Sequence, residues 1–133
     1  CVESFSGNSV RKKDILIIDY LPERVMFFIE WIGHHNLTIV DNIDDALWAI
    51  EYNKYDYIFL GGQFLDDKYG SATVALYLDS HQTNHNYEKA NIVVHSWDIA
   101  EIEKVFRYLP QATFIPYDEG QLMSVCYELS ANL

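Results

Sequence analysis

Short apolar runs alternate along the chain with segments whose apolar residues recur at helical spacing. The runs are DILIID (14–19), LTIV (37–40), YDYIFL (55–60), NIVVHS (91–96) and ATFI (112–115). Nearly continuous apolar runs of this length are typical of strands that are buried on both faces of a parallel sheet. The pattern therefore predicts a strand over each of these runs.

Amphipathic helices are predicted between the strands. The segment 22–32 opens with Pro22, which suits a first helical turn, and Gly33 provides a stop. Asn42 is a candidate N-cap for the next helix. A third helix is expected over 71–78.

Two further helices are predicted after the fourth and fifth runs. Asp98 with Glu101, and Asp118 with Gln121, form capping-box pairs ahead of apolar residues at helical spacing. The polar residues 79–91 are expected to form a long connection. The residues predicted to face the core from all five helices are Val25, Phe28, Ile29, Ile32, Ile43, Ala46, Leu47, Ile50, Val74, Ala75, Leu78, Ile102, Val105, Phe106, Leu122, Val125, Cys126 and Leu129.

The alternation predicts a single α/β domain over 14–133, preceded by a flexible lead-in or a processed start over 1–13. We expect three α/β/α layers around a five-stranded parallel sheet, because helices must cover both faces of such a sheet. Right-handed crossovers favour the flavodoxin-like strand order 2-1-3-4-5.

A functional site in this fold is expected beyond the carboxyl ends of the first, third and fourth strands. That edge collects the residues that follow each run. They are Asp19 and Tyr20, then Gly61 to Asp67, then His95 to Asp98, with Pro116 and Tyr117 after the fifth strand.

Composition narrows the classes of partner. The chain has 133 residues, half of them hydrophobic and 15% aromatic, with a net charge of −11. This acidity argues against nucleic acid, whose phosphates require clustered Lys and Arg, and the cluster at 11–13 is expected to be a solvated lead-in. An acidic surface with exposed aromatic side chains suits a protein partner, and a basic protein in particular.

Cysteine content and hydropathy bear on location. Cys1 and Cys126 are too few for a disulfide framework, which favours a reducing, cytoplasmic location. No apolar run reaches the roughly 18–20 residues that span a membrane, and no signal peptide is recognised.

The stretches ILIIDY, DDALWAIEYNKYDYIFL, IVVHSW and FIPYDEGQLMSVCYEL resemble response-regulator receiver domains, the CheY-like superfamily. The resemblance implies acidic residues that hold Mg²⁺ after the first strand, an Asp nucleophile after the third, a Ser or Thr after the fourth and a Lys after the fifth. Asp19 and Ser96 match. Tyr20, Gly61 and Ile115 stand where the second acid, the phosphoacceptor Asp and the Lys belong.

Glycine has no side chain to phosphorylate, so phosphotransfer at residue 61 is chemically excluded. The first hypothesis is therefore a degenerate receiver-like module that is not phosphorylated, needs no cofactor and acts through protein contact.

A narrower resemblance is to the cyclic-phosphate processing receiver domains. The frame of Leu60 and Phe64 matches their LDHDL-like strand end, and His95 with Ser96 matches their HS pair. Their Asp-His-Asp core is replaced by Gly61-Gly62-Gln63. The resemblance implies an ancestral role on nucleotide or RNA-end phosphates. The second hypothesis is a phosphoesterase that uses His95, Ser96 and Asp19.

Several other residues are candidates for binding. The glycines at 61 and 62 allow a third hypothesis, a small-ligand or nucleotide pocket. The ligand-binding candidates are Asp19, Tyr20, Gly61, Gly62, Gln63, His95, Ser96 and Trp97. A metal is not favoured, and the candidates for holding a divalent cation are Asp19, Asp66 and Asp67. Asp98 is expected to cap a helix rather than act as an acid.

Two pairs of histidines and a set of aromatics complete the candidates. His34 and His35 are expected on the surface. His81 and His85 have a spacing that suits metal ligands on a helix, but their segment is expected to be a loop, so a metal role is not favoured. Six aromatic residues fall off the predicted inner faces or at their margins and form either an exposed patch or a cover for the helix edges. They are Phe27, Trp31, Trp48, Tyr52, Tyr77 and Tyr108.

Overall fold

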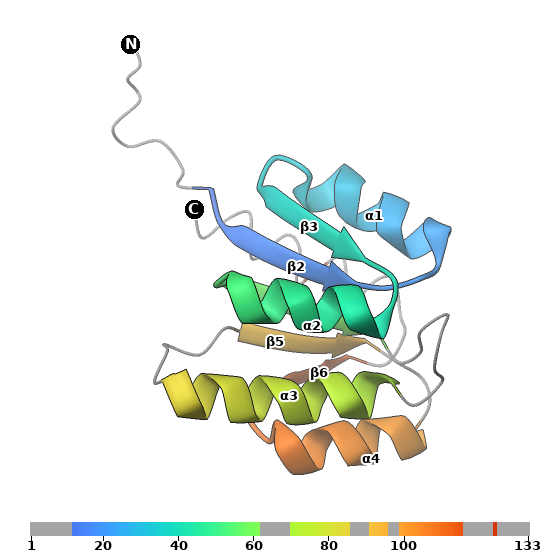
Figure 1. Cartoon of the computed structure of the whole chain (residues 1–133). Coiled ribbons are helices and arrows are strands. Elements are labelled where there is room, and N and C mark those ends of the chain that lie inside the picture. The colour runs from blue at the N-terminus through green and yellow to red at the C-terminus, as the bar shows by residue number, and fades with distance from the viewer. Residues whose placement is uncertain (1–11, 62–69, 86–90, 96–98, 116–123, 125–133) are drawn as a thin grey trace.

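The computed structural model describes residues 12–61, 70–85, 91–95, 99–115 and 124 (Figure 1). Predictions for the lead-in, for the loops after the third and fourth strands and for the last helix lie outside these residues. They include those for Gly62, Gln63, Phe64, Asp66, Asp67, Ser96, Trp97, Asp98, Pro116, Tyr117 and Cys126.

A five-stranded parallel sheet forms the middle of the molecule, with strand order β3-β2-β4-β5-β6. In order along the chain this is 2-1-3-4-5, so the predicted fold class and topology are confirmed. The strands are β2 (Asp14–Ile18), β3 (Asn36–Val40), β4 (Tyr57–Gly61), β5 (Asn91–His95) and β6 (Thr113–Ile115).

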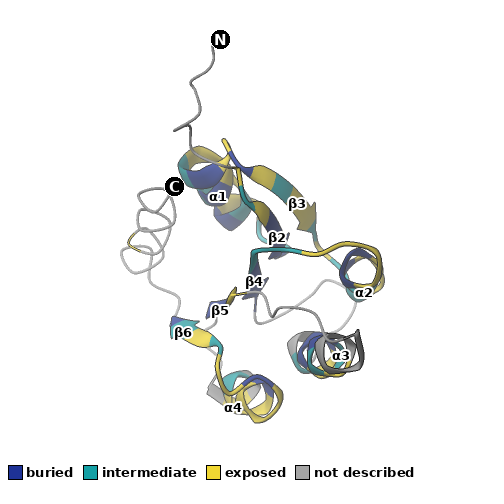
Figure 2. Ribbon diagram, turned by 90° about the vertical axis from the view of Figure 1, so that its left-hand side faces the viewer, coloured by how far each residue is buried: buried dark blue, intermediate teal, exposed yellow. Residues whose placement is uncertain are grey.

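Helices cover both faces of the sheet. The helices are α1 (Pro22–Ile32), α2 (Ile43–Tyr52), α3 (Gly70–His85) and α4 (Ile99–Tyr108). Among them, α1 lies on one face, and α2, α3 and α4 lie on the other (Figures 1 and 2). Each strand therefore contributes alternate residues to two separate cores.

The larger core lies between the sheet and the three helices α2 to α4. Alternate strand residues such as Leu16, Ile18 and Leu60 pack there against Ala46 and Val74. The smaller core lies beneath α1. It consists of Ile15, Ile17, Phe28, Ile32, Phe59, Val93 and Ile115.

Local signals in the sequence set the helix boundaries. Pro22 is in the first turn of α1, where its missing N–H costs no hydrogen bond. The Asn42 side chain accepts a hydrogen bond of 2.9 Å from the backbone N–H of Asp45 and so caps α2 as predicted. The predicted inward residues of α3, Val74, Ala75 and Leu78, are all buried.

The structure corrects the prediction of a connection that starts at residue 79. Helix α3 continues to His85. Its last residues are polar, but their backbone N–H groups still bond to carbonyls four residues earlier, so the helix continues without apolar side chains there. His81 and His85 therefore do lie on a helix, four residues apart.

The inward face of α1 also differs from the prediction. Ile29 is 43% exposed, whereas Arg24 is buried together with Phe28 and Ile32. The face that meets the sheet therefore follows i, i+4 and i+8 from Arg24, and Ile29 turns toward solvent. A charged residue occupies a position that the apolar pattern assigned to its neighbour Val25.

Two further predictions, one of an exposed residue and one of a buried residue, are wrong. His35 is only 5% exposed, because its Nδ1 accepts a hydrogen bond of 3.1 Å from the Lys13 backbone at the amino end of β2. Phe106, predicted to face the core, is 42% exposed and stacks on Phe114 with ring centroids 5.8 Å apart.

Within the described part of the chain, none of the helices combines the length and the apolar character needed to cross a membrane.

Candidate functional site

Three residues predicted for the site meet at the carboxyl edge of the sheet. Gly61 is the last residue of β4 and pairs in register with His95, the last residue of β5. Asp19 follows β2, and its backbone N–H donates a hydrogen bond of 3.0 Å to the Val40 carbonyl of β3. Because side chains alternate along each strand, Asp19 and His95 both point to the face covered by α1.

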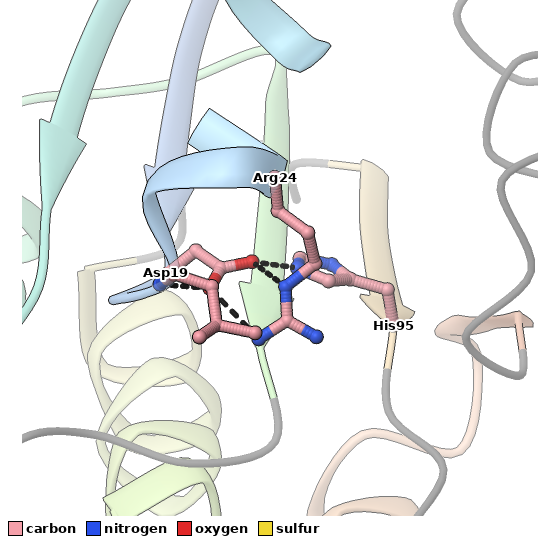
Figure 3. A network of polar contacts seen from close by, with 4 residues as sticks. Asp19, Arg24 and His95 are labelled. Atoms are coloured by element: carbon pink, nitrogen blue, oxygen red, sulfur yellow. Dashed lines mark hydrogen bonds and ion pairs between the residues drawn. The ribbon is translucent and has the colours of Figure 1, made fainter. Parts of the chain in front are cut away.

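Four protein nitrogens lie close to the oxygens of the Asp19 carboxylate. Three of them form hydrogen bonds with it, and the fourth, Nε of Arg24, makes an ion-pair contact. Oδ1 lies 3.0 Å from the backbone nitrogen of Leu21 and 2.9 Å from Nη2 of Arg24. Oδ2 lies 2.7 Å from Nε of Arg24 and 2.8 Å from Nε2 of His95. Figure 3 shows these side chains converging on the carboxylate. A carboxylate has about four lone-pair positions, so hydrogen bonds from the protein occupy most of the acceptor capacity of Asp19, and the Arg24 guanidinium stands beside it as a counter-charge.

Arg24 is the member of the site that the sequence pattern did not identify. Its side chain is 8% exposed, and it meets Asp19 through a hydrogen bond from Nη2 to Oδ1 and a close ion-pair contact of Nε with Oδ2. The available signal was its position, four residues before Phe28 and eight before Ile32. A charged residue in line with two buried apolar residues indicates a buried ion pair.

His95 is fully buried. Since an ionised carboxylate can only accept, Nε2 of His95 carries a hydrogen and donates it to Asp19. Nδ1 has no hydrogen-bond partner among the residues that the structure describes. The ring packs edge-on against Phe28, with centroids 5.5 Å apart, and lies 6.5 Å from the ring of Phe59. The imidazole is thus held between a carboxylate and an aromatic wall.

Gly61 leaves no room for a side chain. A Cβ built on it would lie 2.9 Å from the carbonyl oxygen of Ile18, closer than a Cβ approaches another atom in real structures. It would also lie 3.5 Å from Nε2 of His95 and 3.6 Å from Cγ of Asp19. The position is therefore central to the site, and the neighbouring strand β2 approaches it closely.

The polar contacts lower the pKa of the Asp19 carboxyl. Burial by itself raises this pKa, because it disfavours the charged form. The hydrogen bond from His95 and its electrostatic interaction, together with the Leu21 amide and the Arg24 guanidinium, outweigh burial and hold the pKa below its ordinary value. Asp19 is therefore a buried carboxylate that stays ionised at neutral pH.

This lowered pKa predicts a loss of stability in acid. The unfolded chain binds the proton of Asp19 more readily than the folded chain does. The contribution of Asp19 is therefore complete above the pKa of the unfolded state, about 4, and is lost as the pH falls through the lower folded value. Urea unfolding should show a larger loss between about pH 5 and about pH 3 in the natural protein than in Asp19→Asn. The exposed control Asp44→Asn should keep the natural dependence, and equal slopes in all three proteins would contradict this prediction.

Among the described residues, the centre offers a divalent cation little open ligand capacity. Mg²⁺ prefers carboxylates and water as ligands, but the buried Asp19 carboxylate already accepts three hydrogen bonds from the protein, and the Arg24 guanidinium supplies a positive charge beside it. No group of three or more His, Cys, Asp and Glu side chains with metal-binding geometry occurs in the described ranges.

Tyr20 lines a cavity that also reaches Asp19 of this centre. It is half-buried, and the cavity of about 310 Å³ lies near the ends of β2 and β3, with Asp41, Asp45 and Ile39 among the other lining residues. The structure therefore brings together Asp19, Gly61 and His95 and places Tyr20 on a cavity that borders Asp19.

Neither a protein-family model nor a curated protein matches the sequence. Solved structures of low identity do match. The receiver domain of a sensor histidine kinase from Pseudomonas aeruginosa, with magnesium in its active-site cleft, is 12% identical, covers 89% of this chain and 97% of its own, and gives a TM-score of 0.66. A response regulator from Burkholderia pseudomallei, with a phosphorylated aspartic acid and a calcium ion, is 16% identical over 91% of this chain and 72% of its own, with a TM-score of 0.66.

A third match, a putative response regulator from Chloroflexus aurantiacus, is 15% identical, covers 91% of this chain and 99% of its own, and has a TM-score of 0.67. The structures that match are consistently response-regulator receiver domains. The chain therefore has the receiver-like, CheY-like fold that the resemblance implied.

Proposed function

We propose that this chain is a receiver-like module that is not phosphorylated and that acts through contact with a protein partner. The observation that carries the proposal is the closed polar centre formed by Asp19, Arg24 and His95 next to Gly61. Phosphorylation of a receiver needs a carboxylate nucleophile and a cation held beside it. Here the nucleophile position has no side chain, and the neighbouring carboxylate is committed to protein donors.

The contrast with the matched structures supports this interpretation of the centre. One of them holds magnesium in its active-site cleft, and another carries a phosphorylated aspartic acid with calcium. In this chain Arg24 brings a permanent positive charge to Asp19, which a bound cation would otherwise supply. Because Arg24 is part of the chain, its positive charge cannot dissociate from the centre as a bound cation can. The charge beside Asp19 is therefore constant.

Exposed apolar side chains support action through contact. Each of the four described helices carries at least one large apolar side chain that the fold leaves in solvent. These residues are Met26, Ile29, Trp48, Tyr52, Leu76, Phe106 and Tyr108. Such side chains are more costly to leave in water than to cover with a partner. The strongly acidic charge favours a protein partner over nucleic acid.

The experiment is a thermal-shift and mass measurement with a phosphate-donor mimic. We expect beryllofluoride with Mg²⁺ to leave the melting temperature unchanged, and acetyl phosphate with Mg²⁺ to add no phosphoryl mass. A receiver domain with an intact Asp site serves as the positive control and should respond to both. A shift of several degrees, or a covalent adduct at any residue, would overturn the proposal.

The phosphoesterase hypothesis is tested with the same protein. It requires the buried Asp19–His95 pair to act on a substrate, and Ser96 lies outside the described residues. We expect no turnover of 2′,3′-cyclic nucleotides with any divalent cation. Turnover that is lost in His95→Ala would establish the enzyme and defeat the proposed function.

A further inference from the structure

The outward face of α2 gathers aromatic and acidic side chains around one tryptophan. Trp48 is 63% exposed and Tyr52 is 67% exposed. Their ring centroids lie 5.0 Å apart, one helical turn from each other. Asp44, Asp45 and Glu51 lie four residues before, three before and three after Trp48, and all three are exposed. At these spacings all four neighbours share its side of the helix. We call these five residues the Trp48 face.

The hydrophobic core does not use the two aromatic side chains of this face. Helix α2 packs on the sheet through Ala46, Ala49 and Ile50, all of which are buried. In Figure 2 the exposed residues of α2 lie on the side that turns away from the sheet. Trp48 and Tyr52 are therefore large apolar groups whose exposure costs free energy without supporting the core.

A hydrogen bond positions one carboxylate of the Trp48 face. The hydroxyl of Tyr77 on α3 donates to Oε1 of Glu51 at 2.6 Å. This bond, with smaller contributions from burial and charge, raises the pKa of Tyr77 to about 12. Glu51 is thereby held at the junction of α2 and α3, beside the aromatic pair. Tyr77 therefore borders the Trp48 face from α3, which packs against α2.

This combination of groups matches the chemistry of arginine. An indole ring is the best aromatic partner for a cation placed over its face. Nearby carboxylates accept the planar guanidinium through paired hydrogen bonds. No residue of α2 is basic, and the chain as a whole carries a charge of −11. A positively charged partner is therefore attracted over a distance and then held by contact.

We infer that the Trp48 face docks a basic segment of a partner protein, with an arginine side chain placed over the Trp48 ring between the carboxylates. The inference deepens the proposed function and rests on it, since it names the surface and the class of partner. Charge argues against other occupants, because a second copy would bring its own carboxylates to the same place. Phosphates of nucleic acid or of an anionic membrane would be repelled in the same way.

The test measures binding of a short peptide in which arginine alternates with glycine. The control peptide carries citrulline, which keeps the shape of arginine and lacks its charge. Binding is followed by tryptophan fluorescence and by the shifts of backbone amides in nuclear magnetic resonance spectra, which also show which surface responds. The natural chain should bind the arginine peptide, with the shifts centred on α2, and should ignore the citrulline peptide.

Variants on the surface separate this face from general acidity. We expect Trp48→Ala to weaken binding about tenfold and Asp44→Asn to weaken it by a smaller factor. Both side chains lie on the outer side of α2, so both variants should fold. The matched control Met26→Ala removes another 63% exposed apolar side chain, from α1 on the opposite face of the sheet, and should bind as tightly as the natural chain.

Several outcomes would overturn the inference. They are equal binding by Trp48→Ala, equal binding of the citrulline peptide, self-association of the chain that Trp48→Ala abolishes, and capture by anionic vesicles through this face. The failure of this inference can be distinguished from the failure of the proposed function. Arginine binding that appears only after treatment with a phosphate donor would defeat the proposed function and keep the surface. A chain that does not respond to a phosphate donor and binds the arginine peptide without using Trp48 would keep the proposed function and defeat the inference about the surface.

Discussion

Replacing Arg24 with methionine should lower the free energy of unfolding by about 3–5 kcal/mol. The substitution keeps most of the side-chain length and removes the charge. Asp19 then stays buried, with its side chain 0% exposed, but without the cation that faces it. A buried carboxylate that has lost a charged partner is costly, because water cannot reach it and the remaining contacts from His95 and the Leu21 amide do not replace the guanidinium. Urea unfolding followed by circular dichroism provides the measurement.

The matched control is Arg107→Met, which removes an exposed arginine in the last turn of α4. It should change stability by well under about 1 kcal/mol, as surface substitutions generally do. Asp19→Asn alone and the double variant complete a cycle, in which the double variant should lose less than the sum of the two single losses. Strict additivity, or similar losses for Arg24→Met and Arg107→Met, would show that the pair does not hold the centre together.

Gly61→Ala should destabilise the fold by about 1–3 kcal/mol, although alanine in a strand interior is ordinarily better than glycine. The reason is the 2.9 Å approach of the added Cβ to the Ile18 carbonyl oxygen. That oxygen belongs to the backbone of β2, which is paired on both sides in the sheet and cannot move independently. Thermal and urea unfolding of the variant measure the effect.

Gly61→Asp tests whether the receiver chemistry can be restored by one substitution. We expect it to be at least as unstable as Gly61→Ala and to take up no phosphoryl group from acetyl phosphate and Mg²⁺. The introduced carboxylate would stand beside Asp19, which already accepts hydrogen bonds from Arg24, His95 and the Leu21 amide. A stable and phosphorylated Gly61→Asp variant would show that the centre had kept an open cation site.

Periodicity in the sequence was sufficient for the architecture. Alternating apolar runs and amphipathic segments predicted the sheet and its order, and the rule that sites lie at the carboxyl ends of parallel strands placed Asp19, Gly61 and His95 at one edge. This worked because strand burial is decided by local runs of apolar residues. The absence of a nucleophile at residue 61 required only the identity of the residue.

Helix orientation could not be predicted to the same accuracy. Val25 and Ile29 fit the apolar template, yet Arg24 is the residue that turns inward on α1. The rotation of α1 about its axis differs from the prediction by one residue position. This rotation is set by the side chains beneath the helix, which include Asp19 and the ring of His95. In the same way His35 is buried because the Lys13 backbone N–H at the amino end of β2 donates to it.

Taken alone, the sequence determined that this chain alternates strands and helices in a receiver-like order and that residue 61 cannot accept a phosphoryl group. Only the tertiary structure decided that Asp19 binds Arg24 and His95, and that the Ile18 carbonyl of β2 lies too close to Gly61 for a side chain there. Both facts depend on distances between residues far apart in the chain, with 76 positions separating Asp19 from His95. Local propensity carries no information about such distances, because they arise when the strands pair and the helix settles on them.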